Sequence, residues 1–406
     1  MAKRTNRRSK QPAASAAATT PAPLASPSWR QLVLDVGLPF ALSRVLLLLV
    51  AGLFANHPRG LTWIPKFAER GWAYSQSRWL DVWARWDASW YLEIVTKGYQ
   101  QGGYAIGEYS SMAFFPLYPQ AVRLLYRLLP TAWQGEQAAV ALGVLVANAC
   151  ALGAAFMLYW HVRARFDDRA MAQRSVVYLL AFPTAFFLGC FYSEATILLL
   201  LVAAYHMAWR RRWAAAAVLG GLLSATRSVG VLMVLPFLWM QLEDAGFKLG
   251  KLGKRALWLL LVPAGFIAYA IYLWRLTGDA GAVVIVQRAW RKEFSSPLAL
   301  FGTPPTLYGD LVHLDRLLIL AFAAAAAWLL SRRTWRADGL VVLVVLASFA
   351  FTGTPISASR YLLMAFPVFV WLAARQSAGV RYAYLGAAVT MQTALWICWV
   401  LMRWVA

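Results

Sequence analysis

The amino-acid sequence predicts an all-α polytopic membrane protein, a bundle of about eleven transmembrane helices with one long loop between the first two. Two observations lead to this fold class. Of the 406 residues, 61% are hydrophobic and only 14% are charged, whereas soluble domains carry about a quarter charged residues. The hydrophobic residues also fall in long segments. One soluble core cannot bury so much apolar surface, so lipid is the solvent that remains.

Residues 1–29 predict a disordered, basic tail. Five Lys and Arg residues precede position 11 without an acidic neighbour, and a run rich in Ala, Pro, Ser and Thr follows. Such a composition cannot form a core. A cleaved signal peptide is the alternative, but the first apolar segment begins near residue 33 and is long enough to cross a membrane. We therefore expect the tail to be retained in the cytoplasm, and residues 30–406 to form the membrane domain.

The apolar segments follow one another along the rest of the chain. A membrane-spanning helix needs about 17–25 mostly apolar residues. Several segments are short for a full span, and we expect these to be broken or tilted. The predicted segments are 33–55, 137–161, 174–190, 194–209, 213–226, 228–242, 256–275, 316–332, 339–353, 361–374 and 382–402.

The positive charge of the chain predicts its orientation. The net charge of +22 does not indicate nucleic-acid binding, because the chain offers no soluble basic face. Lys and Arg instead mark cytoplasmic loops. With a cytoplasmic N-terminus, every short basic loop falls inside, and residues 56–136 and 276–315 form two long extracytoplasmic loops. The inside loops are 163–174, 210–212, 248–255, 332–336 and 375–381.

The first long loop contains an amphipathic stretch at residues 121–129. Leucines form one helical stripe, while Arg123 and Arg127 lie four residues apart on another face. Such a helix is expected to lie in the membrane interface. It could instead span the membrane with both arginines on its polar face, but every later loop would then change sides.

The most informative part of this loop is the segment around Asp87. Trp86, Trp90 and Tyr91 supply flat amphipathic rings that suit a membrane interface or a sugar face. An aspartate among these rings is partly desolvated, so its pKa is expected to rise unless Arg85 or another cation compensates its charge. This setting suits a general base. The alternative is that Asp87 caps a helix that begins at the next residue.

Three other polar groups stand at the outer ends of apolar segments. The topology that orders the basic loops also places Asp87, Glu194, Arg227 and Arg360 on one membrane face. Arginine suits phosphate, because its planar fork binds two oxygens. Alternatively, the arginines reach lipid headgroups or pair with the two carboxylates. Arg44 lies in the first span and needs a partner, for which Glu194 is a candidate.

The sequence assigns no metal and no cofactor. The cysteines lack CxxC spacing, the four histidines are scattered, and the spacing of Asp81 and Asp87 is no recognised ligand signature. There is no Walker loop, dinucleotide fingerprint or Ser-His-Asp pattern, so an ATP-driven pump is unsupported. The cysteines are Cys150, Cys190 and Cys398.

Several short motifs resemble those of the PIG-V-type mannosyltransferases, bacterial relatives of the second mannosyltransferase of GPI-anchor assembly. The resemblance covers roughly residues 33–375, the motifs occur in the family's order, and residues 382–406 lie outside it. The motifs are Arg85-Trp86-Asp87-Ala88 with Trp90-Tyr91 and Gly98-Tyr99, then Phe114-Phe115-Pro116-Leu117-Tyr118-Pro119, Tyr192-Ser193-Glu194-Ala195, Ala225-Thr226-Arg227-Ser228 and Ser359-Arg360-Tyr361-Leu362.

The resemblance implies a glycosyltransferase of superfamily C (GT-C) that uses polyprenyl-phosphate sugars and needs no nucleotide sugar. It implies that Asp87 is the essential acid of the first outer loop, that Arg227 and Arg360 contact the donor phosphate, and that Glu194 is a second acid or a structural partner. The acceptor is a lipid, a glycan or a protein. Residues expected to support the site are Arg85, Trp86, Trp90, Tyr91, Ser193, Ser228 and Tyr361.

These expectations define one reaction and one geometry. Asp87 takes a proton from an acceptor hydroxyl, and a single displacement inverts the anomeric centre of mannose. A related enzyme that uses another sugar, and a lipid or glycan transporter without catalysis, are the alternatives. The transporter does not explain the aromatic, Asp-bearing loop. The geometric expectation is that Asp87, Arg227 and Arg360 meet in one pocket on the non-cytosolic side.

Overall fold

The computed structural model describes residues 27–54, 73–100, 108–290, 294–302, 311–375 and 377–405. Within these ranges the chain folds into helices and contains no strand. The longer helices are α2 (Leu38–Phe54), α7 (Glu136–Phe166), α8 (Arg169–Ala181), α9 (Glu194–Trp209), α10 (Trp213–Ser224), α13 (Ala264–Thr277), α16 (Leu311–Ser331), α17 (Arg336–Ala350) and α20 (Ala378–Val400). The shorter ones are α1 (Trp29–Leu32), α4 (Arg78–Asp81), α5 (Ala88–Thr96), α6 (Leu117–Arg127), α11 (Val229–Leu232), α12 (Val234–Asp244), α14 (Ala282–Ile285), α15 (Ala299–Gly302), α18 (Ala358–Tyr361) and α19 (Phe366–Ala373).

The described helices include five that are long and apolar enough to cross a membrane. Each predicted apolar segment falls on one or more helices, which confirms an all-helical membrane fold. Most of the other segments form helices shorter than a full span, so the count of about eleven spans stays a prediction. The five helices are Trp29–Phe54, Glu136–Phe166, Gly253–Thr277, Leu311–Ser331 and Ala378–Val400.

The break between α8 and α9 shows why one predicted segment is not a single helix. Helix α8 ends at Ala181, and Phe182 turns to an extended conformation (φ −56°, ψ 142°). Phe182 precedes Pro183, whose ring disfavours the helical conformation in the residue before it. The chain passes through the 3₁₀ turn η5 (Ala185–Leu188) and starts α9 at Glu194. The polar residues before and at this start therefore stand at a helix N-terminus.

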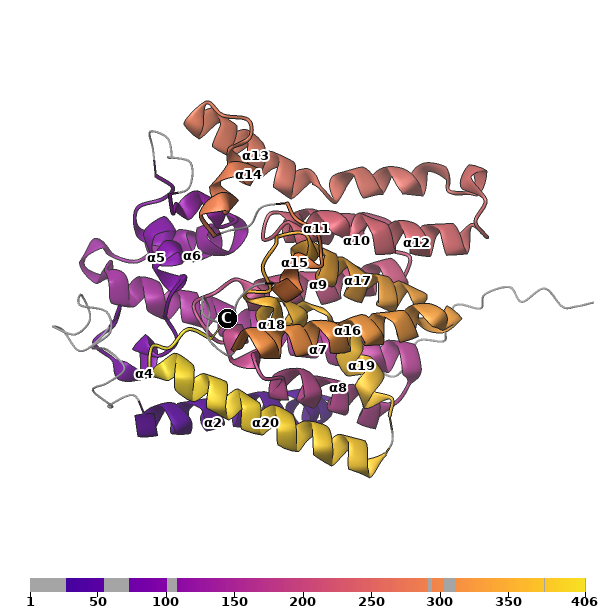
Figure 1. Cartoon of the computed structure of the whole chain (residues 1–406), viewed down its shortest axis with the longest axis horizontal. Helices are drawn as coiled ribbons and strands as arrows, with labels where there is room; N and C mark the ends of the chain where they lie inside the picture. Colours follow the sequence, from indigo (N-terminus) through magenta and orange to yellow (C-terminus); the bar gives the residue numbers. More distant parts are fainter. Residues whose placement is uncertain are drawn as a thin grey trace, which may run out of the picture.

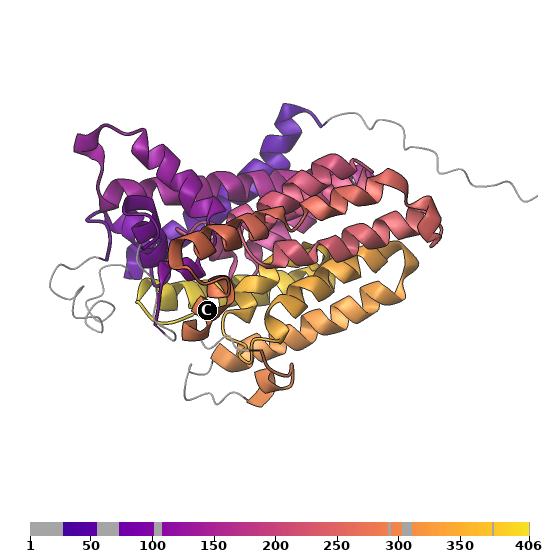
Figure 2. The same cartoon turned by 90° about the horizontal axis from the view of Figure 1, so that it is seen from above.

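The helices form one bundle whose two ends differ (Figure 1). The short helices α4, α5 and α6 gather at one end, at the left of Figure 1, while the turns that follow α12 and α16 lie at the other end in both views (Figures 1 and 2). Those two turns carry the basic stretches 248–255 and 332–336. The Asp87 region and these basic loops thus occupy opposite ends of the bundle.

Helix α20 runs along α2 and closes one side of the bundle (Figure 1). Two buried tryptophans of α20 fix this position. The indole N–H of Trp396 donates to the carbonyl of Leu47 at 2.7 Å, and that of Trp399 donates to the carbonyl of Val82 at 2.8 Å. Because buried polar groups must be hydrogen-bonded, these two contacts hold the end of α20 against α2 and the chain after α4.

Helix α6 contains most of the stretch 121–129, which the sequence analysis placed in the membrane interface. It has 11 residues, which at 1.5 Å per residue is about half of a membrane crossing. The Arg123 guanidinium donates to the carbonyls of Ile94 and Val95 at 2.7 and 2.9 Å. This contact satisfies carbonyls in the last turn of α5. Helix α6 by itself is shorter than a full span, which favours the interfacial placement, and that placement stays a prediction.

Two other predictions fall wholly or partly outside the described residues. The tail at residues 1–29 is described only from residue 27, and its disorder stays a prediction. In the first long loop, residues 55–72 and 101–107 lie outside the described ranges.

Candidate active site

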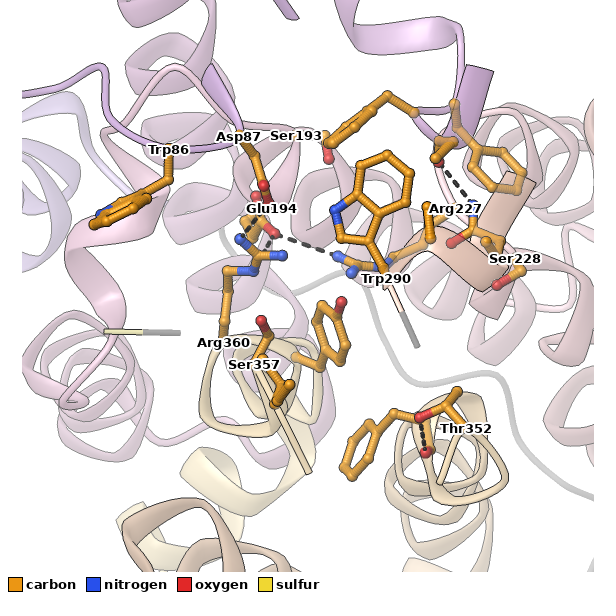
Figure 3. A pocket seen from close by; sticks show the side chains of 18 of the residues that line it. Trp86, Asp87, Ser193, Glu194, Arg227, Ser228, Trp290, Thr352, Ser357 and Arg360 are labelled. Atoms are coloured by element: carbon orange, nitrogen blue, oxygen red, sulfur yellow. Dashed lines mark hydrogen bonds and ion pairs between the residues drawn. The ribbon is translucent and has the colours of Figure 1, made fainter. Parts of the chain in front are cut away.

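Most of the predicted site residues line one cavity of about 1120 Å³. It opens between α5, the start of α9, the turn between α10 and α11, and α18 (Figure 3). Segments far apart in the sequence therefore meet here, as the shared membrane face predicted. The predicted residues that line the cavity are Trp86, Asp87, Tyr91, Ser193, Glu194, Arg227, Ser228, Arg360 and Tyr361.

Four charged side chains form a continuous chain of ion pairs, which we call the ionic quartet: Asp87, Arg360, Glu194 and Arg227. Arg360 lies between the two acids, with Nη1 3.2 Å from Asp87 Oδ2 and Nε 3.1 Å from Glu194 Oε1 (Figure 3). Arg227 Nη1 is 3.3 Å from the same oxygen of Glu194. The formal charges of the quartet cancel, which is what allows charges to be buried together.

Burial is uneven along the quartet. The side chains of Glu194 and Arg360 are only 2% and 7% exposed, while those of Asp87 and Arg227 are 14% and 20% exposed. Burial alone would lower the pKa of the Arg360 guanidinium, but the charges of Glu194 and Asp87 outweigh it and raise that pKa well above its usual value. All four side chains line the cavity, and the outer members, Asp87 and Arg227, are the more exposed to it.

The backbone of Asp87 is held by Tyr192. The Asp87 N–H donates to the Tyr192 hydroxyl at 3.0 Å, and that hydroxyl donates to the carbonyl of Arg85 at 2.9 Å. Asp87 occupies the N-cap position of α5, but its side chain makes no capping hydrogen bond, so the capping alternative is wrong. Among the described residues, only one carboxylate oxygen of Asp87 has a partner, and the residue lines the cavity.

Of the two possibilities for the charge beside Asp87, Arg85 or another cation, the structure shows another cation. Arg85 itself forms a buried ion pair with Asp81, at 2.8 Å from Oδ2. The Asp81 carboxylate also accepts backbone N–H groups of Ala73, Tyr74 and Ser75 at 2.7 to 3.2 Å. The Asp81 carboxylate therefore accepts hydrogen bonds from the loop before α4 as well as from Arg85. The cation next to Asp87 is Arg360, which comes from much later in the chain.

The turn that carries Arg227 depends on a glycine. A Cβ at Gly230 would lie 2.3 Å from the backbone nitrogen of Ser224, so only glycine permits this close return of the chain. The turn places the Arg227 guanidinium 3.8 Å over the ring of Tyr361, a cation–π contact that orients its plane.

The short helix α18, which carries Arg360, is held from α16. Oδ1 of the buried Asp315 accepts the backbone N–H of Ser359 at 2.8 Å. Because that N–H belongs to the first turn of α18, the carboxylate supplies the cap that the turn otherwise lacks.

Arg44 does not pair with Glu194. Its Nε donates instead to the side-chain oxygen of Asn148 at 2.8 Å, and its guanidinium lies 4.6 Å from the centre of the Phe40 ring. Glu194 is occupied by Arg227 and Arg360. A half-buried amide and an aromatic face, rather than a carboxylate, accommodate this cation.

Aromatic residues form part of the cavity wall. Tyr91, Phe114 and Trp290 line the cavity, whereas Trp90 is not among its lining residues. Trp90 packs behind this wall, with ring centroids 6.1 Å from Phe114 and 6.0 Å from Trp290. The Tyr91 hydroxyl lies 3.0 Å from Ser193 Oγ. Trp90 thus supports the wall, and Trp290 is one of the lining rings that the sequence analysis missed.

The last described residues also reach this cavity, which the sequence analysis did not foresee. Arg403 and Trp404 line it, and the Trp404 ring meets that of Trp86 edge to face with centroids 5.2 Å apart. This segment follows a span-length apolar helix, and nothing in its composition indicates that it folds back over a site. Other lining residues that were missed are Tyr109, Gln287, Ser348, Thr352, Thr354 and Ser357.

Three residues with left-handed backbone surround the cavity. Trp86, Ser357 and Met402 have φ of 50°, 65° and 59°. Non-glycine residues adopt this conformation rarely, and such strain clusters at functional sites. Each of the three stands within three residues of a charged group that lines the cavity.

Comparison of the whole chain with solved structures finds similar folds at low sequence identity. ArnT from Cupriavidus metallidurans bound to undecaprenyl phosphate has 14% identity and a TM-score of 0.52, over 85% of this chain and 63% of that one. The oligosaccharyltransferase of Archaeoglobus fulgidus in the apo form has 13% identity and a TM-score of 0.46, over 89% and 56% of the two chains. Its complex with an inhibitory peptide and a dolichol-phosphate has 13% identity and a TM-score of 0.47, over the same shares.

This chain thus spans about 63% of the length of ArnT, and the likeness shows a shared fold. No curated protein sequence matches the chain significantly. The model of the mannosyltransferase (PIG-V) family matches residues 52–274, more than half of the chain. This match includes the segments that carry Asp87, Glu194 and Arg227. The protein therefore belongs to the mannosyltransferase (PIG-V) family.

Proposed function

We propose that the protein transfers mannose from a polyprenyl-phosphate donor to an acceptor hydroxyl at the extracytoplasmic membrane face. The observation that carries this proposal is the position of Asp87. One oxygen of its carboxylate is held by Arg360, and the residue lines a cavity of about 1120 Å³ with an aromatic wall. A fixed carboxylate beside such a cavity suits a general base for a sugar reaction.

A lipid-linked phosphate suits the arginines of the quartet. Arginine has five N–H donors, and within the described residues Arg227 uses one of its nitrogens for Glu194. The Arg227 side chain is the most exposed of the quartet, and it lines the cavity. The fold is shared with ArnT, whose structure contains undecaprenyl phosphate, and this supports a donor of the same class.

The reaction is a single displacement. Asp87 takes the proton of the acceptor hydroxyl while the acceptor oxygen attacks the anomeric carbon. The bond from that carbon to the phosphate oxygen breaks, and its electron pair stays on the phosphate. Attack from the opposite face inverts the configuration. Arg227 and Arg360 stabilise the charge that develops on the leaving phosphate.

The ion pair between Asp87 and Arg360 connects the two halves of this reaction. When Asp87 gains the proton, its attraction for Arg360 weakens. At the same moment the leaving phosphate gains negative charge, and the guanidinium is free to move toward it. The aromatic wall of Tyr91, Phe114 and Trp290 offers faces against which a sugar ring packs.

The proposed orientation follows from the two ends of the bundle. The basic turns after α12 and α16 lie opposite the end that carries α5 (Figure 1). Loops rich in Lys and Arg remain in the cytoplasm, which puts the basic tail inside and the Asp87 cavity outside. Fusion of a reporter to the turn after α12 tests this orientation, because a cytoplasm-specific reporter is active there only if the proposal is right.

A transfer assay tests the function. Membranes containing the wild-type chain are supplied with polyprenyl-phosphate mannose labelled in the sugar, and label in lipid, glycan and protein fractions is compared with membranes containing equal amounts of Asp87→Asn. We expect label to depend on the wild-type chain. Transfer from a glucose or arabinose donor instead would overturn the choice of sugar. Movement of the lipid without transfer would overturn the enzymatic proposal.

Binding of the donor phosphate is tested with undecaprenyl phosphate and the purified full-length protein in detergent. Arg227→Ala and Arg360→Ala are expected to bind it more weakly than wild type. Unchanged affinity in both variants would remove the proposed role of these arginines.

A further inference from the structure

We infer that Arg403, which follows α20 and lies outside the matched family region, binds a phosphate oxygen of the lipid-linked donor. This inference rests on the proposed function. It starts from the charges of the described residues that line the cavity. The ionic quartet contributes two positive and two negative charges that already pair with one another. Arg403 is the further charged side chain among these lining residues.

Charge accounting favours Arg403 as an anion contact. A phosphate that approaches Arg227 or Arg360 must compete with Glu194 or Asp87 for the same guanidinium. The Arg403 side chain is exposed and has no ion-pair or hydrogen-bond partner among the described residues. Its planar group can therefore meet two phosphate oxygens without breaking an existing pair. With Arg403 the described lining carries a net charge of +1.

The backbone of Arg403 is held in place by the packing of Trp399 before it and Trp404 after it. Trp399, one turn earlier, is fully buried and bonded to Val82. Helix α20 ends at Val400, and the Arg403 N–H returns to the carbonyl of Cys398 at 2.8 Å. On the other side, Trp404 packs against Trp86, the neighbour of Asp87. Fixed supports on both sides reduce the conformational entropy lost when a ligand binds.

Arg403 therefore contributes to the cavity from outside the region that the family model matches. The match ends at residue 274, whereas Arg403 reaches the cavity through α20 and its packing on α2. Arg403 thus adds a phosphate contact to those of Arg227 and Arg360, from a segment that lies outside the matched region.

The test compares three forms of the full-length protein in detergent, wild type, Arg403→Gln and Arg403→Lys. Arg381→Gln serves as the matched control, because Arg381 is a half-buried arginine on the same helix, near its opposite end. Each protein is titrated with undecaprenyl phosphate, with undecaprenol, which lacks the phosphate, and with phosphatidylglycerol. Circular dichroism and the melting temperature without ligand verify that the variants fold.

We expect Arg403→Gln to weaken binding of undecaprenyl phosphate by about tenfold, the effect of losing one charge-assisted contact. Arg403→Lys should recover part of this loss, because it keeps the charge without the planar fork. Binding of undecaprenol should be equal in all forms, and Arg381→Gln should match wild type. In the transfer assay the donor KM should rise while kcat stays close to wild type.

Three results would overturn the inference. Equal affinity of wild type and Arg403→Gln for undecaprenyl phosphate would exclude the contact and leave the proposed function intact. A loss confined to phosphatidylglycerol would make Arg403 a contact to bulk lipid headgroups. If wild type itself does not bind undecaprenyl phosphate, the proposed donor is wrong and this inference falls with it.

Discussion

The Tyr192 hydroxyl accepts the backbone N–H of Asp87 at 3.0 Å and so ties the candidate base to the segment before α9. The same hydroxyl donates to the carbonyl of Arg85. One side chain therefore fixes both ends of the short turn that presents Asp87, and this turn includes the left-handed residue Trp86. The position of the carboxylate depends on a residue that does not itself line the cavity.

Tyr192→Phe removes both hydrogen bonds and keeps the ring. We expect kcat to fall while the affinity for undecaprenyl phosphate changes little, and the free energy of unfolding to drop by about 1–3 kcal/mol because buried polar groups lose their partner. Steady-state kinetics and thermal melting measure the two effects. Tyr382→Phe, at an exposed tyrosine of α20, is the control. If Tyr192→Phe lowers the melting temperature but keeps the wild-type kcat, the hydroxyl stabilises the fold without positioning Asp87.

Asp87→Asn keeps the shape of the side chain and its oxygen for Arg360 but cannot accept the acceptor proton. We expect turnover to fall by about 10²–10⁴-fold, with normal abundance and donor binding. Asp167→Asn is the control, because Asp167 is an exposed acid in a turn paired with Arg163. Normal turnover in correctly folded Asp87→Asn would end the assignment of Asp87 as base.

Glu194→Gln removes the negative charge shared by Arg227 and Arg360. Without ligand the variant should be less stable, by about 3–5 kcal/mol, because buried cations lose their partner. The cavity also gains net positive charge, so undecaprenyl phosphate should stabilise the variant more than it stabilises wild type. Melting curves without and with undecaprenyl phosphate test both expectations, the lower stability and the larger stabilisation by the lipid. Glu243→Gln, at an exposed acid, is the control. Equal stabilisation of both proteins would contradict a phosphate bound at the quartet.

Asp315→Ala removes the acceptor of the Ser359 N–H. We expect it to lower stability by about 1–3 kcal/mol and to reduce activity by loosening α18, which carries Arg360. Asp315→Asn keeps an oxygen at this position and should retain most of both properties. The comparison separates capping from charge, since equal losses in the two variants would mean that the negative charge is what matters.

Gly230→Ala should be strongly destabilising, because its Cβ would lie 2.3 Å from the backbone of Ser224. Relief of this clash must move the turn that carries Arg227, and donor binding should weaken with stability. Gly386→Ala is the matched control, since nothing lies within 4 Å of a Cβ there, and alanine in a helix is favoured by about 0.5–1 kcal/mol. Unchanged donor affinity in folded Gly230→Ala would show that Arg227 does not depend on this turn.

The fold class and the meeting of Asp87, Glu194, Arg227 and Arg360 could be predicted from the sequence. Long apolar segments and the sidedness of basic loops are properties of composition and order, and they place distant residues on one face without any knowledge of packing. The number of spans could not be settled in this way. A proline such as Pro183 ends a helix inside an apolar segment, and apolar composition alone does not show where a helix stops.

The partners of the charged residues were harder to predict, because proximity in sequence is a poor guide to them. Arg85 is two residues from Asp87 and pairs with Asp81, whereas the partner of Asp87 is Arg360. Arg44 uses Asn148, an amide without charge. The role of residues 401–404 depends on how α20 packs against α2, and the apolar pattern of a span-length helix contains no information about where the chain after it returns.

The left-handed residues Trp86, Ser357 and Met402 have a consequence for engineering this protein. Positions with positive φ are where glycine or asparagine substitutions relieve strain and raise the melting temperature. All three residues line the candidate cavity, so if the proposed function is right, stabilising substitutions at them are expected to lower turnover. Stabilising substitutions are better sought at the end of the bundle that carries the turns after α12 and α16, because residues there do not line the cavity.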